Sequence, residues 1–293
     1  MKKGFGKLKL KDAFLQQTLK GQMDIDIQEY RPVVVYINGK YFGIYNIREK
    51  LDETYVERHY NVLKENVDFI EKNNDVNNGT IDDYQKLLNY VKTNDLRNDD
   101  VYEYVKEQVD VQELANYWVA VTYFDQFDPI NIKFYKIKGK KWRWIIFDLD
   151  QSFFDWSYQK INYNLPFNPY AHGNGYYLDT TLMSELIKNG DFRQLYIETF
   201  AKHLRTTFKP ERMIEILNKM VEEIEDEMPY HIDRWYEESL GVSSYTLDNM
   251  SEWKRNLDVF KTQLKGRHRS AVSTIKSGLN LTNEEYNRYF KDV

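Results

Sequence analysis

The sequence predicts an α+β fold, with strands concentrated before about residue 150 and helices after it. Two observations carry this prediction. Two β-hairpin patterns lie in the first half of the chain, and from Leu182 onward the apolar residues recur at helical spacing. We therefore expect a hairpin-rich region at 1–150, which holds the candidate site, and an aromatic loop with helices at 151–293. The two regions are expected to form one continuous unit.

Composition narrows the range of functions. The chain has 293 residues and a formal net charge of −5, so it lacks the basic surplus typical of proteins that bind duplex nucleic acid. Cysteine is absent, which excludes disulfides, thiolate zinc sites and a cysteine nucleophile. No apolar run is long enough to cross a membrane. The basic start has no apolar core behind it and does not resemble a signal peptide. Compartment and oligomeric state stay open.

The first hairpin is marked by an Asn-Gly turn. Residues 33–37 are apolar and mostly β-branched, Asn38-Gly39 follows, and 40–47 form the return strand. Both turn residues must adopt positive φ, which suits this dipeptide. Asp52 then has the position of an N-cap for a helix that ends at Tyr60.

The remaining elements are predicted from the spacing of apolar residues and from turn-forming and helix-capping residues. An Asn- and Asp-rich stretch at 68–80 predicts a loop or an irregular strand. A second hairpin is expected over 132–137 and 142–147, and Phe153 to Tyr177 is expected to be a long ordered loop. The predicted helices cover 82–93, 111–124 capped by Asp110, 183–189, 192–208, 210–225 and 251–277.

The best candidate site is formed by Asp128, Asn131, Asp148 and Asp150. If the second hairpin turns at Gly139-Lys140, Asn131 lies directly across from Asp148, with Cβ atoms about 5 Å apart. Asp150 then shares a face with Asp148 because strand side chains alternate. Asp128 precedes the strand closely enough to reach this group.

Carboxylate and amide oxygens without nitrogen or sulfur ligands favour Mg²⁺, Ca²⁺ or Mn²⁺ over zinc. The alternative is that the two aspartates only cap a strand end and Asn131 is a turn residue. The string Asp148-Leu149-Asp150-Gln151-Ser152 also imitates the nucleophile loop of haloacid-dehalogenase phosphatases, and Asp-x-Asp occurs in glycosyltransferases. Neither alternative has the expected strand–helix alternation around it. The five histidines are scattered, and His231 is expected to be a half-buried, hydrogen-bonded residue rather than a catalyst.

Two motifs resemble those of the CotH family, the spore-coat-protein-H-like atypical kinases of bacteria. Residues 36–50, from Tyr36 to Lys50, are similar to its first signature hairpin. The second signature is matched by Tyr123-Phe124, Asp128, Asn131-Ile132-Lys133 and Trp142 to Asp150. Phe147 stands where the family commonly has the Trp of Trp-Asp-x-Asp. The resemblance runs from about Leu10 to Leu281.

The resemblance implies a distant protein-kinase-like fold that uses ATP and Mg²⁺ (or Mn²⁺) to phosphorylate Ser or Thr of a protein substrate. It implies that Asp148, with Asp150 beside it, binds metal and that Asn131 is a second metal ligand. Asp128 matches the catalytic base, with Asp125 as a rival because the spacing to Asn131 is shorter than in protein kinases.

The resemblance also assigns a nucleotide side to the site. Glu49 is implied to lie near the nucleotide or to pair with a lysine, and Arg48 and Lys50 are candidates for phosphate contact. No glycine-rich phosphate loop is visible. The rival hypothesis is a non-catalytic surface or coat protein that uses the same scaffold, with the aromatic segment from Phe153 to Tyr177, to bind peptide or glycan.

Overall fold

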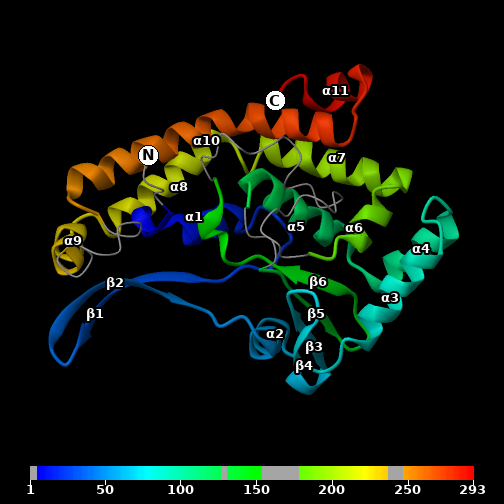
Figure 1. Cartoon of the computed structure of the whole chain (residues 1–293), viewed down its shortest axis with the longest axis horizontal. Coiled ribbons are helices and arrows are strands. Elements are labelled where there is room, and N and C mark those ends of the chain that lie inside the picture. Colours follow the sequence, from blue (N-terminus) through cyan, green and yellow to red (C-terminus); the bar gives the residue numbers. More distant parts are fainter. Residues whose placement is uncertain (1–4, 127–130, 154–177, 237–246) are drawn as a thin grey trace.

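The structure, a computed structural model, describes residues 5–126, 131–153, 178–236 and 247–293. It confirms the α+β class. A layer of helices packs over a small antiparallel sheet, and a long hairpin projects to one side (Figure 1). The likeness to a protein-kinase fold stays a prediction. Among the described residues, no helix combines the length and the apolar character needed to cross a membrane.

The main sheet has four antiparallel strands in the order β4-β3-β5-β6. The strands β5 and β6 bury large aromatic side chains, including Tyr135, Trp142 and Trp144. The edge strand β4, in contrast, is mostly polar and almost fully exposed. The strands are β3 (Val67–Glu71), β4 (Asp75–Asn78), β5 (Lys133–Ile137) and β6 (Trp142–Ile145).

The second hairpin forms as expected, but its predicted register is wrong by one residue. Lys136 pairs with Trp142 and Lys133 with Ile145, whereas a turn centred on Gly139-Lys140 would pair Ile137 with Trp142. The turn is three residues long, because Gly139 takes a φ of +76° and the Lys140 N–H donates to the carbonyl of Ile137 at 2.8 Å. Strand pairing therefore does not place Asn131 across from Asp148.

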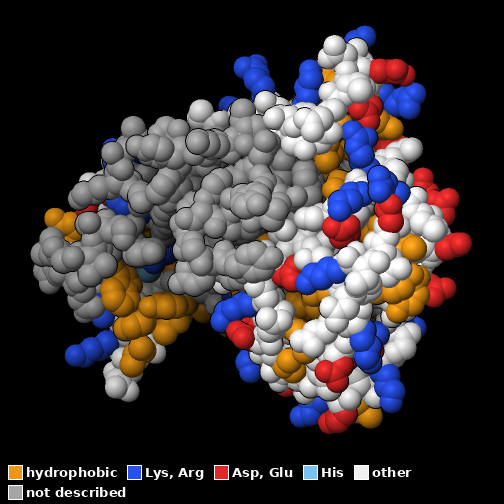
Figure 2. Space-filling model, turned by 45° about the vertical axis from the view of Figure 1, so that its right-hand side comes forward, with side chains coloured by type: hydrophobic (Ala, Val, Ile, Leu, Met, Phe, Trp, Pro, Cys, Tyr) orange, Lys and Arg blue, Asp and Glu red, His pale blue; other side chains and the backbone are white. Residues whose placement is uncertain are grey.

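The first hairpin is confirmed as β1 (Tyr30–Ile37) and β2 (Lys40–Arg48) around Asn38-Gly39. Among the described residues these strands pair only with each other. A bulge between Val35 and Tyr36 shifts the register. A hydrophobic band lies along the lower left of Figure 2, where the hairpin projects. Its exposed apolar side chains are Val34, Tyr36, Ile37, Tyr45 and Ile47.

The three helices predicted between the two hairpins match their predicted limits closely. Asp52 caps α2 (Glu53–Tyr60), since its Oδ1 accepts from the Thr54 N–H at 3.0 Å. Asp110 caps α5 (Val111–Phe124), whose side chains from Glu113 onward are all buried. The helix α3 (Asp82–Thr93) also forms as predicted. Of the two alternatives for 68–80, the irregular strand is the correct one, because the stretch supplies most of β3 and all of β4, with a register shift between Phe69 and Ile70.

The C-terminal half contains the predicted helices with shifts of a few residues at their ends. The predicted ranges did not include α1 (Lys11–Leu19), α4 (Asp99–Gln108) or the helices at 228–236 and 283–290. The aromatic segment predicted from Phe153 to Tyr177 lies outside the described residues, except for Phe153 itself. The helices are α6 (Thr181–Leu186), α7 (Gly190–Arg205), α8 (Pro210–Glu222), α9 (Met228–Tyr236), α10 (Met250–Gly278) and α11 (Asn283–Phe290).

The larger hydrophobic core draws on both halves of the chain. Phe14 of α1 meets Phe260 of α10 edge to face, with ring centroids 5.7 Å apart. Tyr123 of α5 stacks on Phe208 at 3.9 Å. A smaller cluster lies between α2 and the sheet, where Tyr55 and Val56 pack with Phe69 and Tyr135. These contacts fix α1 and α5, the two helices nearest the candidate site, against the rest of the molecule.

Gly43 is predicted to be essential for the contact between β2 and α9. It has a φ of +122°, and a Cβ atom there would lie 2.6 Å from His231 Nδ1 and 3.0 Å from Trp235 Nε1. We expect Gly43→Ala to lower the free energy of unfolding by roughly 2 kcal/mol or more. Gly266→Ala is the matched control, because a Cβ there meets nothing within 4 Å, and a helical Gly-to-Ala change should be neutral or stabilising. Chemical denaturation of both variants tests this. An equal effect of the two changes would contradict it.

Candidate functional site

Asn131 and Asp148 meet at the end of the second hairpin. Asn131 Nδ2 donates to Asp148 Oδ2 at 2.6 Å, and both side chains are half-buried. The two residues lie just beyond the paired ends of β5 and β6. The structure thus brings together two of the predicted metal ligands, although not through the predicted strand register.

The chain turns at Asp148, whose backbone is in the left-handed region. Its φ and ψ are 54° and 51°, and the 3₁₀ turn η3 (Leu149–Gln151) follows at once. Aspartate is one of the few residue types that tolerate this conformation. Gln126, at the end of α5, fixes the turn by donating from Nε2 to the Asp148 carbonyl at 2.5 Å. Asp150 therefore lies on a 3₁₀ turn, and the predicted strand alternation of Asp148 and Asp150 is wrong.

Asp12 of α1 ties this turn to the first hairpin. Its Oδ1 accepts from the Leu149 N–H at 2.8 Å, and its Oδ2 pairs with Arg48 Nη1 at 2.5 Å. The carboxylate also accepts from Gln16 Nε2 at 3.0 Å. The half-buried Asp12 carboxylate thus joins α1, β2 and η3. We expect it to hold the turn after Asp148 in place.

A lysine lies among the acidic groups. Lys11 is buried, and burial lowers the pKa of its ammonium to about 8, while Asp150 and Asp125 act in the opposite direction. Burial raises the pKa of the Asp150 carboxyl, and the negative charge of Asp12 raises it further. The ammonium of Lys11 and a hydrogen bond with Asp148 act in the opposite direction, but the net pKa is raised. The site therefore combines close carboxylates with one buried ammonium, an arrangement that suits binding of a cation and of an anion side by side.

The predicted nucleotide residues are engaged in contacts within the protein. Arg48 binds Asp12 and also donates from Nη2 to Gln28 Oε1 at 3.2 Å. Glu49 pairs with His59, Oε1 to Nε2 at 2.8 Å, and not with a lysine. Burial would raise the pKa of Glu49, but hydrogen bonds from His59 and from the Glu29 N–H outweigh it and lower the pKa. The ammonium of Lys50 is exposed and lies 2.9 Å from Asp52 Oδ2.

Glu49 and Lys50 line a polar pocket of about 520 Å³. Lys133 of β5 also lines it and is nearly buried, with Nζ 2.6 Å from Glu71 Oε1 and 3.0 Å from the Leu51 carbonyl. Phe147, the residue before Asp148, forms part of the same wall. We did not expect a role for Lys133 from the sequence, although a lysine at the start of an apolar strand, two residues after Asn131, was a signal that could have revealed it.

The sequence profile of the family described as CotH kinase protein matches residues 6–271. The chain belongs to the CotH family. A search of curated proteins finds no match. The two motifs that suggested the resemblance both lie within the matched region of this CotH protein.

Asp125 and Asp128, the two candidate bases, differ in whether the structure describes them. Asp128, the predicted base, lies outside the described residues, whereas Asp125 is described and influences the ammonium of Lys11. Within the described ranges there is no group of three or more His, Asp or Glu side chains arranged to hold a metal ion. The roles assigned to Asp128, Asp148, Asn131 and Asp150 stay predictions.

We predict that Asp12 is important for the stability of the CotH site. Asp12→Ala removes the acceptor of the Leu149 N–H and leaves Arg48 without its carboxylate, so unfolding should become easier by about 1–3 kcal/mol. Glu215→Ala, which breaks the exposed pair with Lys219, should change nothing resolvable. Urea denaturation compares the two variants. Wild-type stability in Asp12→Ala would show that this carboxylate does not fasten the turn.

Proposed function

We propose that this CotH-family protein is an atypical protein kinase that transfers a phosphoryl group from ATP to Ser or Thr hydroxyls of a protein substrate. The observation that carries the proposal is the contact between Asn131 and Asp148, with Asp150 and the buried Lys11 beside it. Protein kinases use an aspartate and an asparagine to hold their metal ions. The family match supports a kinase-like protein in the coarser sense.

The residues present fit a magnesium or manganese ion. Mg²⁺ is typically held by one or two carboxylates together with substrate phosphates, so a full cage of protein ligands is not needed. Asp148 and Asp150 offer carboxylates, and Asn131 offers its amide oxygen once the side-chain amide turns over. When bound, the ion neutralises negative charge on the phosphates.

The protein groups have separate tasks in this proposal. Asp128 accepts or orients the proton of the acceptor hydroxyl, with Asp125 as the alternative base. Lys11 presents its ammonium toward the negative charge of the phosphates. Arg48 holds Asp12 against the Leu149 N–H, which keeps the turn after Asp148 in position. Catalysis of this kind depends mostly on positioning and charge neutralisation.

The pocket next to Phe147 is the proposed place for the nucleoside part of ATP. Glu49 lines it, and Lys50 and Lys133 supply ammonium groups at its wall. The pocket also contains Asp52, Glu53 and Glu71, so its carboxylates outnumber its lysines. Such a wall suits the hydrogen-bonding sugar and base better than the triphosphate, which we assign to the side of Lys11 and Asp148.

A non-catalytic binding role is the second candidate. The apolar side chains exposed on β1 and β2 favour it, because contiguous exposed apolar surface often marks an interaction site. Under this alternative the acidic turn would be structural, and removal of Asp148 would not alter any phosphate transfer.

Transfer of the labelled γ-phosphate of ATP to a Ser/Thr-rich protein mixture tests the proposal. We predict that Asp148→Ala and Asp128→Ala each reduce the labelling by at least about 100-fold, since each removes a charge placed at the reacting groups. Asp100→Ala, a charge change on the exposed start of α4, should label like wild type. Circular dichroism shows whether each variant is folded. Equal labelling by wild type and Asp148→Ala would refute the kinase assignment.

A further inference from the structure

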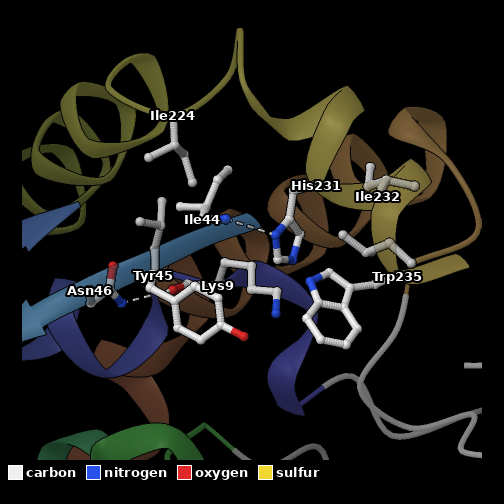
Figure 3. Close-up of a pocket in the computed structure, with 10 residues that line it drawn as sticks. Lys9, Ile44, Tyr45, Asn46, Ile224, His231, Ile232 and Trp235 are labelled. Carbon is white, nitrogen blue, oxygen red and sulfur yellow. Dashed lines mark hydrogen bonds between the residues drawn. The ribbon is translucent and has the colours of Figure 1, made fainter. Parts of the chain in front are cut away.

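A second cavity lies between β2 and α9, apart from the residues assigned above. It has a volume of about 400 Å³, within the range typical of small-molecule sites. Ile44 and Tyr45 come from β2, Ile224 follows α8, and His231 and Trp235 come from α9 (Figure 3). The walls are mostly aliphatic and aromatic. An apolar or aromatic ligand group would therefore bury its surface favourably against this lining.

Lys9 is the only charged residue among the described residues that line the cavity. No described residue forms an ion pair or a hydrogen bond with its ammonium, and burial lowers its pKa. In Figure 3 the ammonium lies between the rings of Tyr45, His231 and Trp235. The backbone of Lys9 is held in a left-handed conformation, φ +64°, and its carbonyl accepts from Asn46 Nδ2 at 3.4 Å. A charge that is largely removed from water without a partner is costly.

His231 adds a second donor on the same side. Its Nδ1 accepts from the Ile44 N–H at 3.0 Å, so the neutral ring carries its proton on Nε2. Burial, followed by the charge of Lys9, lowers the pKa of His231 to about 4, which keeps the ring neutral at physiological pH. The Trp235 indole is already used, because Nε1 donates to the Phe42 carbonyl at 3.1 Å. The expected half-buried His231 is in fact buried, and it is hydrogen-bonded as predicted.

We propose that this cavity binds a molecule with a single carboxylate on an apolar body. The carboxylate pairs with the Lys9 ammonium and accepts from His231 Nε2–H, and the apolar body packs against Ile44, Ile224 and Trp235. The absence of any acidic residue among the described lining residues favours an anion over a cation or a neutral ligand. A single ammonium matches a monoanion better than a phosphate. This site is independent of the kinase assignment and would exist in a catalytically inactive protein.

The first experiment measures binding of phenylbutyrate and of its neutral amide, phenylbutyramide, by titration calorimetry or ligand-detected NMR. We expect the wild-type protein to bind the acid at least about tenfold more tightly than the amide, because only the acid pairs with Lys9. Lys9→Met should remove this preference. Lys40→Met, the same change at an exposed position of the hairpin, should retain it. Equal binding of acid and amide by wild type, or an unchanged preference in Lys9→Met, would overturn the proposal.

A second variant guards against misfolding of Lys9→Met. Ile224→Phe keeps the ammonium but fills the cavity, so it should weaken binding of phenylbutyrate. Unaltered binding in this variant would place the ligand elsewhere and contradict the proposal. The peptide acetyl-Ala-Ala-Phe, with a free or an amidated C-terminus, distinguishes the two sources of the carboxylate. Tighter binding of the free-carboxylate peptide than of phenylbutyrate indicates a peptide terminus, and the reverse order indicates a small organic acid.

Discussion

The Asp12 carboxylate is the constraint on which the arrangement of the site depends. It accepts from the Leu149 N–H and binds Arg48, so helix α1, strand β2 and the turn after Asp148 share one anchor. The residues around it divide their tasks. Lys11, one position earlier, lies among the site carboxylates, whereas Lys9, two positions before Lys11, lines the cavity beside α9. The backbone of Lys9 is left-handed, so the chain turns there and the two lysine side chains reach different sites.

Local signals in the sequence were sufficient for most of the secondary structure. The Asn38-Gly39 turn specified the first hairpin, and the caps Asp52 and Asp110 specified where two helices begin. The register of the second hairpin could not be read in this way. Gly139 permits both a two-residue and a three-residue turn, and the choice depends on how Trp142 and Trp144 pack in the core. Helix α1 was missed because its buried side chains surround it, so it lacks the one-sided apolar pattern.

The site was predictable in its central pair and not in its supports. Asn131 and Asp148 lie close in sequence on either side of one hairpin, so a turn alone brings them near each other. Asp12 and Arg48 come from distant parts of the chain, and no local pattern indicates that Asp12 accepts from Leu149. Glu49 pairs with His59 rather than with a lysine, and Lys133, which lines the same pocket, pairs with Glu71. Such long-range pairs depend on packing that a single sequence does not reveal.

The most direct test of the account is the thermal stability of the protein with ATP and Mg²⁺ together. A ligand that binds only the folded state at 100 times its Kd stabilises that state by about 2.7 kcal/mol. We expect such a rise in the melting temperature for wild type, a dependence of the rise on Mg²⁺, and loss of the rise in Asn131→Ala, where the amide beside Asp148 is removed. No rise with saturating nucleotide and metal, or the same rise in Asn131→Ala, would contradict the claim that these side chains form one cation and phosphate site.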